Sequence, residues 1–106
     1  MPVYTIARFE VRPDARLDAE RAMHDFASYV RGELPGSMWT VYRDPQAPGR
    51  YLAFNRVEDP KADARQRDAP GTKTFTAALE PLLTSAIELT ECELVTSSDL
   101  QRRHRR

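Results

Sequence analysis

The centre of the chain reads Tyr42-Arg43-Asp44-Pro45-Gln46-Ala47-Pro48-Gly49-Arg50-Tyr51. Pro, Asp and Gly are the residues that turns require, and they interrupt two segments rich in β-branched and aromatic side chains. We therefore predict a strand over residues 38–43, a loop over residues 44–49 and a third strand over residues 50–57 of the 106-residue chain. This hairpin fixes the middle of the fold.

The segments before the hairpin predict one strand and one long helix. Apolar and polar residues alternate over residues 3–11, the period of a strand with two different faces. From residue 14 to about residue 33 the apolar side chains follow a helical stripe made of Ala19, Met23, Phe26 and Val30. Leu34-Pro35-Gly36 then ends the helix.

The segments after the hairpin predict more helix and a last strand. Asp59-Pro60 is typical of a helix start, and a short polar helix follows over residues 61–67. Pro70-Gly71 separates it from a second helical piece that carries Phe75 on its apolar face and for which Thr72 is a candidate cap. The last strand is predicted over residues 86–96.

This β-α-β-β-α-β order predicts an α+β, ferredoxin-like fold. Its four-stranded antiparallel sheet has the strand order 4-1-3-2, and its helices cover one face. Because the strands carry apolar side chains on both faces, a second covering is needed. We predict a homodimer in which two sheets pack face to face through an isologous interface.

Composition gives a single domain over residues 1–97 and a basic tail over residues 98–106. The body holds twelve basic and fifteen acidic side chains, and the tail holds four arginines against Asp99. A frayed tail is the simpler interpretation of this end, so no nucleic-acid partner is expected. Cys92 is the only cysteine, and there is neither a leader segment nor an apolar run of membrane-spanning length. These features favour a cytoplasmic protein without a membrane partner.

Several segments resemble the antibiotic biosynthesis monooxygenase family of dimeric α/β barrels. The resemblance lies in residues 5–13, in Leu34-Pro35-Gly36 before the second strand, in the loop Tyr42-Arg43-Asp44-Pro45 and in Val57-Glu58-Asp59 before the second helix. It covers nearly all of residues 3–96. It implies the dimeric α/β-barrel fold and, in some members, oxygenation of a phenol or hydroquinone without any cofactor.

The resemblance also carries two departures. Haem-degrading members use an Asn, a Trp and a His at positions that correspond here to Ala7, Gln66 (or its neighbour Arg65) and Thr76, which argues against haem degradation. Gly71 stands where the family often has the His of a Thr-Pro-His segment, so no catalytic histidine is carried over.

The candidate site residues come mainly from the hairpin. Trp39, Tyr42, Tyr51 and Phe54 are candidates to line a substrate cavity between sheet and helices, although plain core or dimer contacts are the alternative. Phe75 is a further candidate to contact the substrate.

Polar candidates are fewer. Asn55 is a polar residue inside an apolar strand that could orient a substrate oxygen, or be a structural amide. An imidazole is the side chain suited to accept a proton at physiological pH, so His24 is a candidate proton acceptor, although its place opposite the apolar stripe favours a solvated side chain. Arg8, with Arg56 on the neighbouring strand, could hold an anionic ligand or form cross-strand ion pairs.

The leading hypothesis is a cofactor-independent monooxygenase that acts on a small aromatic, quinol or polyketide-like compound. No Gly-rich loop and no metal-ligand spacing occurs, and this chemistry needs none. The main alternative is a non-catalytic dimeric barrel that binds a small molecule or has a stress-related or regulatory role. An isomerase or lyase on the same fold is a third.

Overall fold

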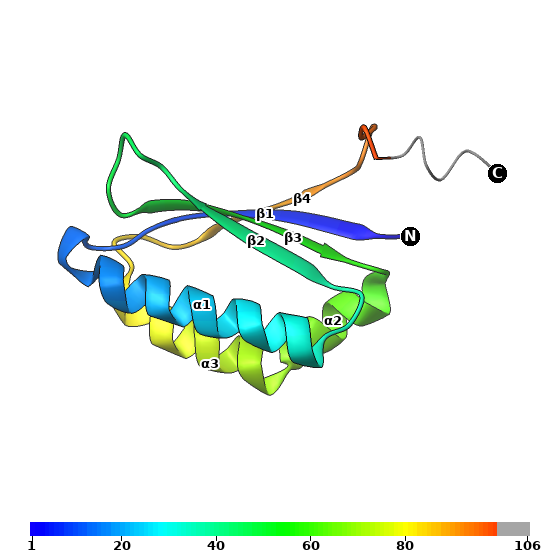
Figure 1. The fold of residues 1–106 in the computed structure, drawn as a ribbon, viewed down its shortest axis with the longest axis horizontal. Coiled ribbons are helices and arrows are strands. Elements are labelled where there is room, and N and C mark those ends of the chain that lie inside the picture. Colours follow the sequence, from blue (N-terminus) through cyan, green and yellow to red (C-terminus); the bar gives the residue numbers. More distant parts are fainter. Residues whose placement is uncertain (100–106) are drawn as a thin grey trace.

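The computed structural model describes residues 1–99, which form a sheet layer and a helix layer (Figure 1). The elements in chain order are β1 Val3–Glu10, a 3₁₀ turn Pro13–Ala15, α1 Arg16–Glu33, β2 Met38–Arg43, β3 Arg50–Val57, α2 Pro60–Asp68, α3 Pro70–Leu79, a 3₁₀ turn Glu80–Leu82 and β4 Glu88–Cys92. The α+β ferredoxin-like fold predicted from the sequence is confirmed.

The four strands form one antiparallel sheet in the order β2-β3-β1-β4. In the central pair Phe9 lies opposite Tyr51 and Thr5 lies opposite Asn55. Because side chains alternate between faces, this register places these four residues on the face that the helices cover. Their neighbours in the chain, such as Ile6 and Phe54, share the open face.

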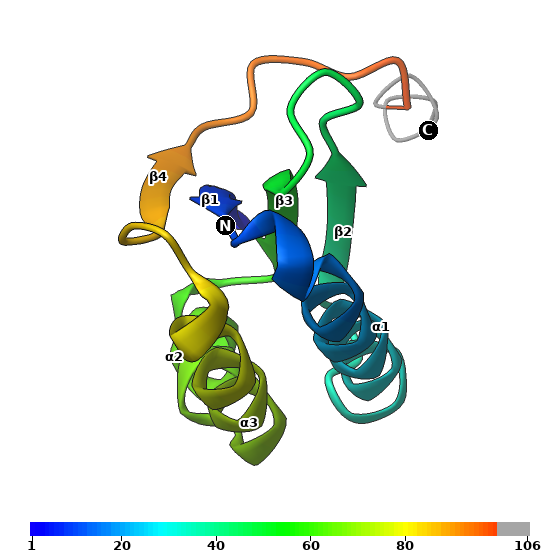
Figure 2. The ribbon, with the colours of Figure 1, turned by 90° about the vertical axis from the view of Figure 1, so that its left-hand side faces the viewer.

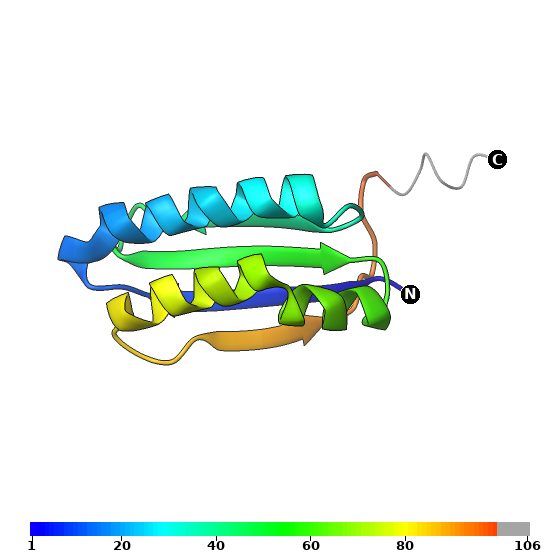
Figure 3. The same ribbon diagram turned by 90° about the horizontal axis from the view of Figure 1, so that it is seen from below.

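All helices lie on one face of the sheet. Viewed end-on, α1 lies under β2 and β3, whereas α2 and α3 lie under β1 and β4 (Figure 2). From below, α1 and α3 run side by side in opposite directions (Figure 3). The predicted apolar stripe of α1 is buried at all four positions, and with Phe9, Val11, Tyr51, Ala53 and Leu79 it makes the core.

The hairpin loop is held by a hydrogen bond within it and by another to the segment that follows β1. The Asp44 carboxylate accepts a hydrogen bond of 2.8 Å from the backbone N–H of Gln46, and the Gly49 carbonyl accepts one of 2.8 Å from the N–H of Val11. Gly49 has φ of +94°, and a Cβ there would overlap the Val11 carbonyl oxygen. Only glycine fits this position without strain.

Two local predictions need correction. The last strand is shorter than predicted, because pairing with β1 involves only Glu88–Cys92. Thr72 does not cap its helix, since α3 begins at Pro70 and Ala69 links it directly to α2. The basic tail falls largely outside the described residues, which end at residue 99. Within them, no helix is both long and apolar enough to cross a membrane.

Gly71 determines how closely α3 approaches α1. A Cβ at this position would overlap the ring of Tyr29 on α1. We expect Gly71→Ala to lower the free energy of unfolding by about 1–2 kcal/mol, because overpacking outweighs the better helix propensity of alanine. Urea denaturation followed by circular dichroism measures this. Gly32→Ala is the control: outside its own helix backbone, no atom lies within 4 Å of the methyl group that alanine would add, so it should stabilise by up to about 1 kcal/mol. Equal effects of both changes would contradict the packing argument.

A carboxylate network joins α1 to the hairpin at the end of the sheet remote from α2. Glu20 accepts hydrogen bonds from Arg43 Nη2 at 2.7 Å, from Arg43 Nε at 2.9 Å and from the Tyr51 hydroxyl at 2.7 Å. The Arg43 bonds, followed by the Tyr51 bond, lower the pKa of Glu20 from 4.5 to about 2. Because the folded-state pKa is depressed, this stabilisation is complete above pH 4.5 and is lost as the pH falls towards 2.

Removing the Glu20 charge should therefore destabilise the protein fully above pH 4.5 and progressively less at lower pH. We expect Glu20→Gln to lower the free energy of unfolding by about 1–3 kcal/mol at pH 7, the range for hydrogen bonds to charged groups. The difference from wild type should shrink as the pH approaches 2.5, measured by urea denaturation across the pH range. If the difference in free energy of unfolding between variant and wild type does not change with pH, the stabilisation does not come from the Glu20 charge.

Candidate functional site

A cavity of about 570 Å³ lies between the helix-covered face of the sheet and helices α2 and α3. Its exposed lining residues lie on β4 and on the two helices, so it opens between them. The wall combines apolar and polar residues from every layer: Thr5, Ala7, Phe9, Phe26, Trp39, Ala53, Asn55, Asp63, Gln66, Arg67, Thr72, Phe75, Thr76, Leu79, Ile87, Leu89 and Glu91.

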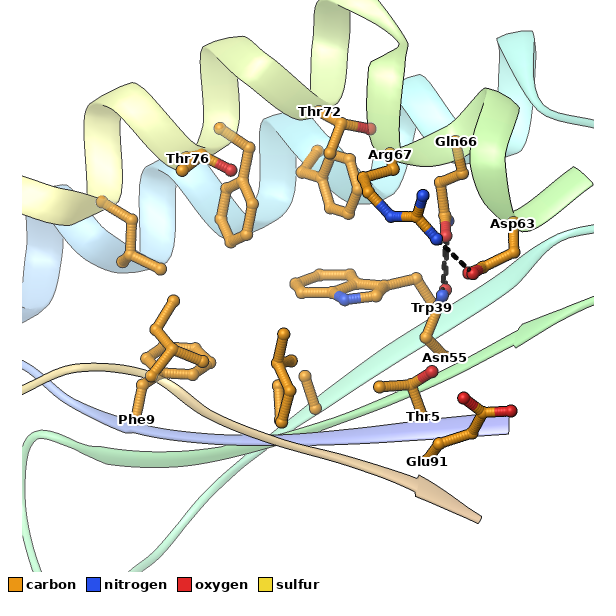
Figure 4. Close-up of a pocket in the computed structure, with 17 residues that line it drawn as sticks. Thr5, Phe9, Trp39, Asn55, Asp63, Gln66, Arg67, Thr72, Thr76 and Glu91 are labelled. Atoms are coloured by element: carbon orange, nitrogen blue, oxygen red, sulfur yellow. Dashed lines mark hydrogen bonds and ion pairs between the residues drawn. The ribbon is translucent and has the colours of Figure 1, made fainter. Parts of the chain in front are cut away.

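Three aromatic rings form one side of this cavity. Phe26 and Phe75 stack with centroids 4.7 Å apart, and Trp39 meets both rings edge-on, at 5.0 Å from Phe26 and 5.5 Å from Phe75. They come from α1, α3 and β2, so three separate elements hold the arrangement. In Figure 4, Trp39 lies between the polar end of the cavity and Phe9. Such a wall suits the face of a planar, apolar ligand.

The polar end is built around a pair of amides. Asn55 Nδ2 donates to Gln66 Oε1 at 2.6 Å, and Gln66 Nε2 donates to Asn55 Oδ1 at 3.1 Å (Figure 4). Asn55 belongs to β3 and Gln66 to α2, so the pair joins the helix to the sheet across one end of the cavity. The pair carries no charge.

Charged side chains lie beside the amide pair. Arg67 donates to the Asp63 carboxylate at 2.7 Å, one helical turn away. Glu91 reaches the same end from β4, and the hydroxyl oxygen of Thr72 is buried without a hydrogen-bond partner. Among residues 1–99, no cluster of three or more His, Cys, Asp or Glu side chains could hold a metal ion.

Comparison with solved structures shows which architecture this is. Rv0793 from Mycobacterium tuberculosis matches with a TM-score of 0.83 and 25% identity, over 92% of this chain and 99% of that one. A candidate antibiotic biosynthesis monooxygenase from Caulobacter crescentus matches with a TM-score of 0.84 and 20% identity, over 90% of this chain and 91% of that one. The chain has the fold of the antibiotic biosynthesis monooxygenases. SnoaB from Streptomyces nogalater, named as a cofactor-independent oxygenase, shares this fold. It matches with a TM-score of 0.77 and 22% identity, over 92% of this chain and 96% of that one.

The antibiotic biosynthesis monooxygenase fold is thus established by structure, in agreement with the sequence resemblance. No protein-family model matches the chain, and no curated protein does either. Gly71, where the sequence resemblance implied a histidine in the family, lies against Tyr29 on α1 and is not among the residues that line the cavity.

The structure brings three of the predicted site residues together. Trp39, Asn55 and Phe75 all line the cavity, although they lie on β2, β3 and α3. Asn55 points inward because it shares the helix-covered face with Ala53 and Val57. Both interpretations of Asn55, as a ligand-orienting group and as a structural amide, are compatible with this place, since it is hydrogen-bonded and also faces the cavity.

Three predicted residues lie on the other face of the sheet. Tyr42 and Phe54 pack edge-on at 5.7 Å on the open face, outside the cavity lining. Arg8 also faces away from the helices, because it pairs with Leu52 between the inward-facing Ala7 and Phe9. Tyr42 and Phe54 were predicted to line a cavity between sheet and helices; the strand register, which alternates sides at every residue, places them on the opposite face.

Tyr51 and His24 also lie outside the cavity wall. Tyr51 is buried behind Phe9, with ring centroids 5.6 Å apart. Burial and its bond to Glu20 raise the pKa of Tyr51 to about 12, so its hydroxyl remains a donor. His24 is exposed on α1, as its place opposite the apolar stripe indicated. Neither residue is among those that line the cavity.

The sequence analysis missed the α2 residues of the site. Gln66, Asp63 and Arg67 line the cavity, yet their helix is polar and only weakly amphipathic. One signal was present: Gln66 stands between Ala62 and Ala69 at helical spacing, in an otherwise small and apolar stripe. That pattern is typical of a buried glutamine.

Proposed function

We propose that this protein is a cofactor-independent monooxygenase that oxidises a small phenolic, quinol or polyketide-like aromatic compound. The observation that carries this proposal is the cavity in which a wall of three aromatic rings ends at an uncharged amide pair. The shared fold with a protein named as a cofactor-independent oxygenase supports it. We place the reaction in the cytoplasm, where a lone cysteine stays reduced.

The chemistry requires little of the protein. In the enol form of the substrate the reacting ring carbon carries one hydrogen. The ring hydroxyl loses its proton, the resulting anion gives one electron to dioxygen, and the carbon radical and superoxide combine at that ring CH. Protonation of the peroxide gives the hydroperoxide R₂CH–OOH. Loss of water then leaves a carbonyl. In total R₂CH₂ and O₂ give R₂C=O and H₂O, so the substrate itself supplies all four electrons that reduce dioxygen.

The cavity offers the three things that this reaction needs. The rings of Phe26, Trp39 and Phe75 hold the substrate plane and exclude water. The N–H groups of the amide pair can stabilise the negative charge that develops on the ring oxygen. The open side between β4 and α3 admits dioxygen and lets the proton leave to solvent.

Oxygen consumption by metal-free, chelator-treated protein tests the proposal. A panel of naphthols, naphthohydroquinones and anthrones should include a compound that is oxidised faster with protein than without it. Label from ¹⁸O₂ should appear in the product carbonyl. If none of these compounds consumes oxygen above the background rate, the enzymatic proposal fails.

A second candidate function is non-catalytic binding of the same class of ligand. It is favoured by the lack of a free proton acceptor among the candidates: the Asp63 carboxylate is paired with Arg67, and His24 does not line the cavity. Tight binding without any oxygen uptake would support this alternative. A product isomerised or cleaved without added oxygen would support an isomerase or lyase.

We also propose that the open face of the sheet is the interface of a homodimer. Large apolar side chains are exposed there, among them Met38 at 60%, Tyr42 at 56% and Phe54 at 40%. Residues 93–99 run over the same face and enclose part of it. An apolar face of this kind favours a second copy of itself, packed isologously.

A further inference from the structure

Gln66 is an unusual residue for its helix. It is 6% exposed, it is the only buried polar side chain of residues 1–99, and it is the only buried residue of α2. Burying an amide costs free energy unless its groups are hydrogen-bonded. Asn55 supplies both bonds, so α2 is docked on the sheet by polar contacts and not by apolar burial.

The reciprocal pairing fixes which groups remain available. A primary amide has two N–H groups, and Asn55 and Gln66 each use one within the pair. One N–H of each residue is left over, and both residues line the cavity. A single amide in a strand could rotate to present either its oxygen or its nitrogen, whereas the pair locks the orientation of Asn55.

The surroundings select the kind of oxygen that these donors can bind. The carboxylates of Asp63 and Glu91 lie at the same end of the cavity, and only one arginine, Arg67, faces them among the lining residues. A ligand carboxylate would be repelled there, whereas a neutral carbonyl or phenol oxygen would not. The buried Thr72 hydroxyl without a partner is a further polar group at this end.

We propose that Gln66 is a positioning residue that holds Asn55 so that the remaining side-chain N–H of Asn55 binds a neutral acceptor oxygen of an aromatic ligand. The inference rests on the proposed function for the location of the site. Its test measures binding and not turnover, so it can succeed or fail whether or not the protein consumes oxygen.

The chain contains two natural reporters for this test. Asn55 is its only asparagine and Trp39 its only tryptophan, so the side-chain N–H signals of both are identifiable in a ¹⁵N–¹H correlation spectrum once Asn55→Leu confirms the former. The probes are 1-tetralone and tetralin, which have the same shape apart from one carbonyl oxygen. Both should shift the Trp39 signal. Only 1-tetralone should shift the Asn55 side-chain signals, and it should bind about 5–10-fold more tightly, as one or two hydrogen bonds allow.

Gln66→Met tests the positioning role with a side chain of similar length. We expect the variant to bind 1-tetralone about 5–10-fold more weakly and tetralin within about twofold of wild type, because only the ketone uses the hydrogen bonds of the pair. Gln46→Met makes the same change on the exposed hairpin loop and should alter neither affinity. Equal losses for both probes would assign Gln66 a merely structural role and overturn the proposal. If Gln66→Met does not fold, the wild-type comparison decides: unchanged Asn55 signals with 1-tetralone, equal affinities, or no binding of either probe would each overturn it.

Discussion

Replacing Asn55 by leucine is expected to lower the rate of substrate-dependent oxygen consumption by about 100-fold, the lower end of the effect of losing one oxyanion donor. Asn55 and Gln66 are the only side-chain amides that line the cavity among residues 1–99. Leucine has the same branched outline as asparagine but cannot share charge with a ring oxygen. The loss should fall mainly on kcat, because the aromatic wall that binds the ring remains.

The design of this experiment must separate chemistry from folding. Asn55→Leu leaves the buried Gln66 amide unpaired, which costs about 1–3 kcal/mol of stability. Rates should therefore be measured well below the melting temperature, with circular dichroism to show that the variant is folded. His24→Ala, on the exposed side of α1, is the matched control and should retain the wild-type rate. A rate for Asn55→Leu close to that of wild type would remove the amide pair from the mechanism.

Replacing Phe54 by glutamate is expected to convert the proposed dimer to a monomer. Phe54 lies near the middle of the open face, where it packs edge-on against Tyr42. In an isologous interface one substitution appears twice, so two carboxylates would be buried without partners, and we expect the dissociation constant to rise more than about 100-fold. Sedimentation velocity at micromolar protein would show this change.

A control on the opposite layer makes the test specific. Leu17 is 81% exposed on α1, so Leu17→Glu places the same charge on the helix-covered side of the molecule. The sedimenting mass of this variant should be the same as that of wild type. A wild-type protein that sediments as a monomer, or a Phe54→Glu variant that remains dimeric, would each contradict the proposed interface.

The fold could be predicted from the sequence because its signals are local. The hairpin loop at residues 44–49, the stripe through Ala19, Met23, Phe26 and Val30, and the Asp59-Pro60 helix start each depend on residues nearby in the chain. Asp59 indeed caps α2, accepting a bond of 2.8 Å from the Ala62 N–H. Local signals in the right order leave few arrangements of four strands and three helices.

The site could be predicted only in part, because it depends on which face each side chain occupies. Trp39 and Phe54 look alike as aromatic strand residues, yet the register sends the first to the cavity and the second to the open face. Alternation within a strand defines two faces but does not say which one the helices cover. A shift of the strand register by one residue would exchange the two faces.

What the sequence alone determined is therefore the order and type of the elements, the apolar stripe of α1 and the candidacy of Trp39, Asn55 and Phe75. Only the tertiary structure revealed that Gln66 meets Asn55 and that Glu20 meets Arg43 and Tyr51. These contacts join residues 11 to 31 positions apart, on different elements. A polar side chain on a weakly amphipathic helix has no local pattern that names its partner. The partner is chosen when apolar burial packs the helix layer against the sheet.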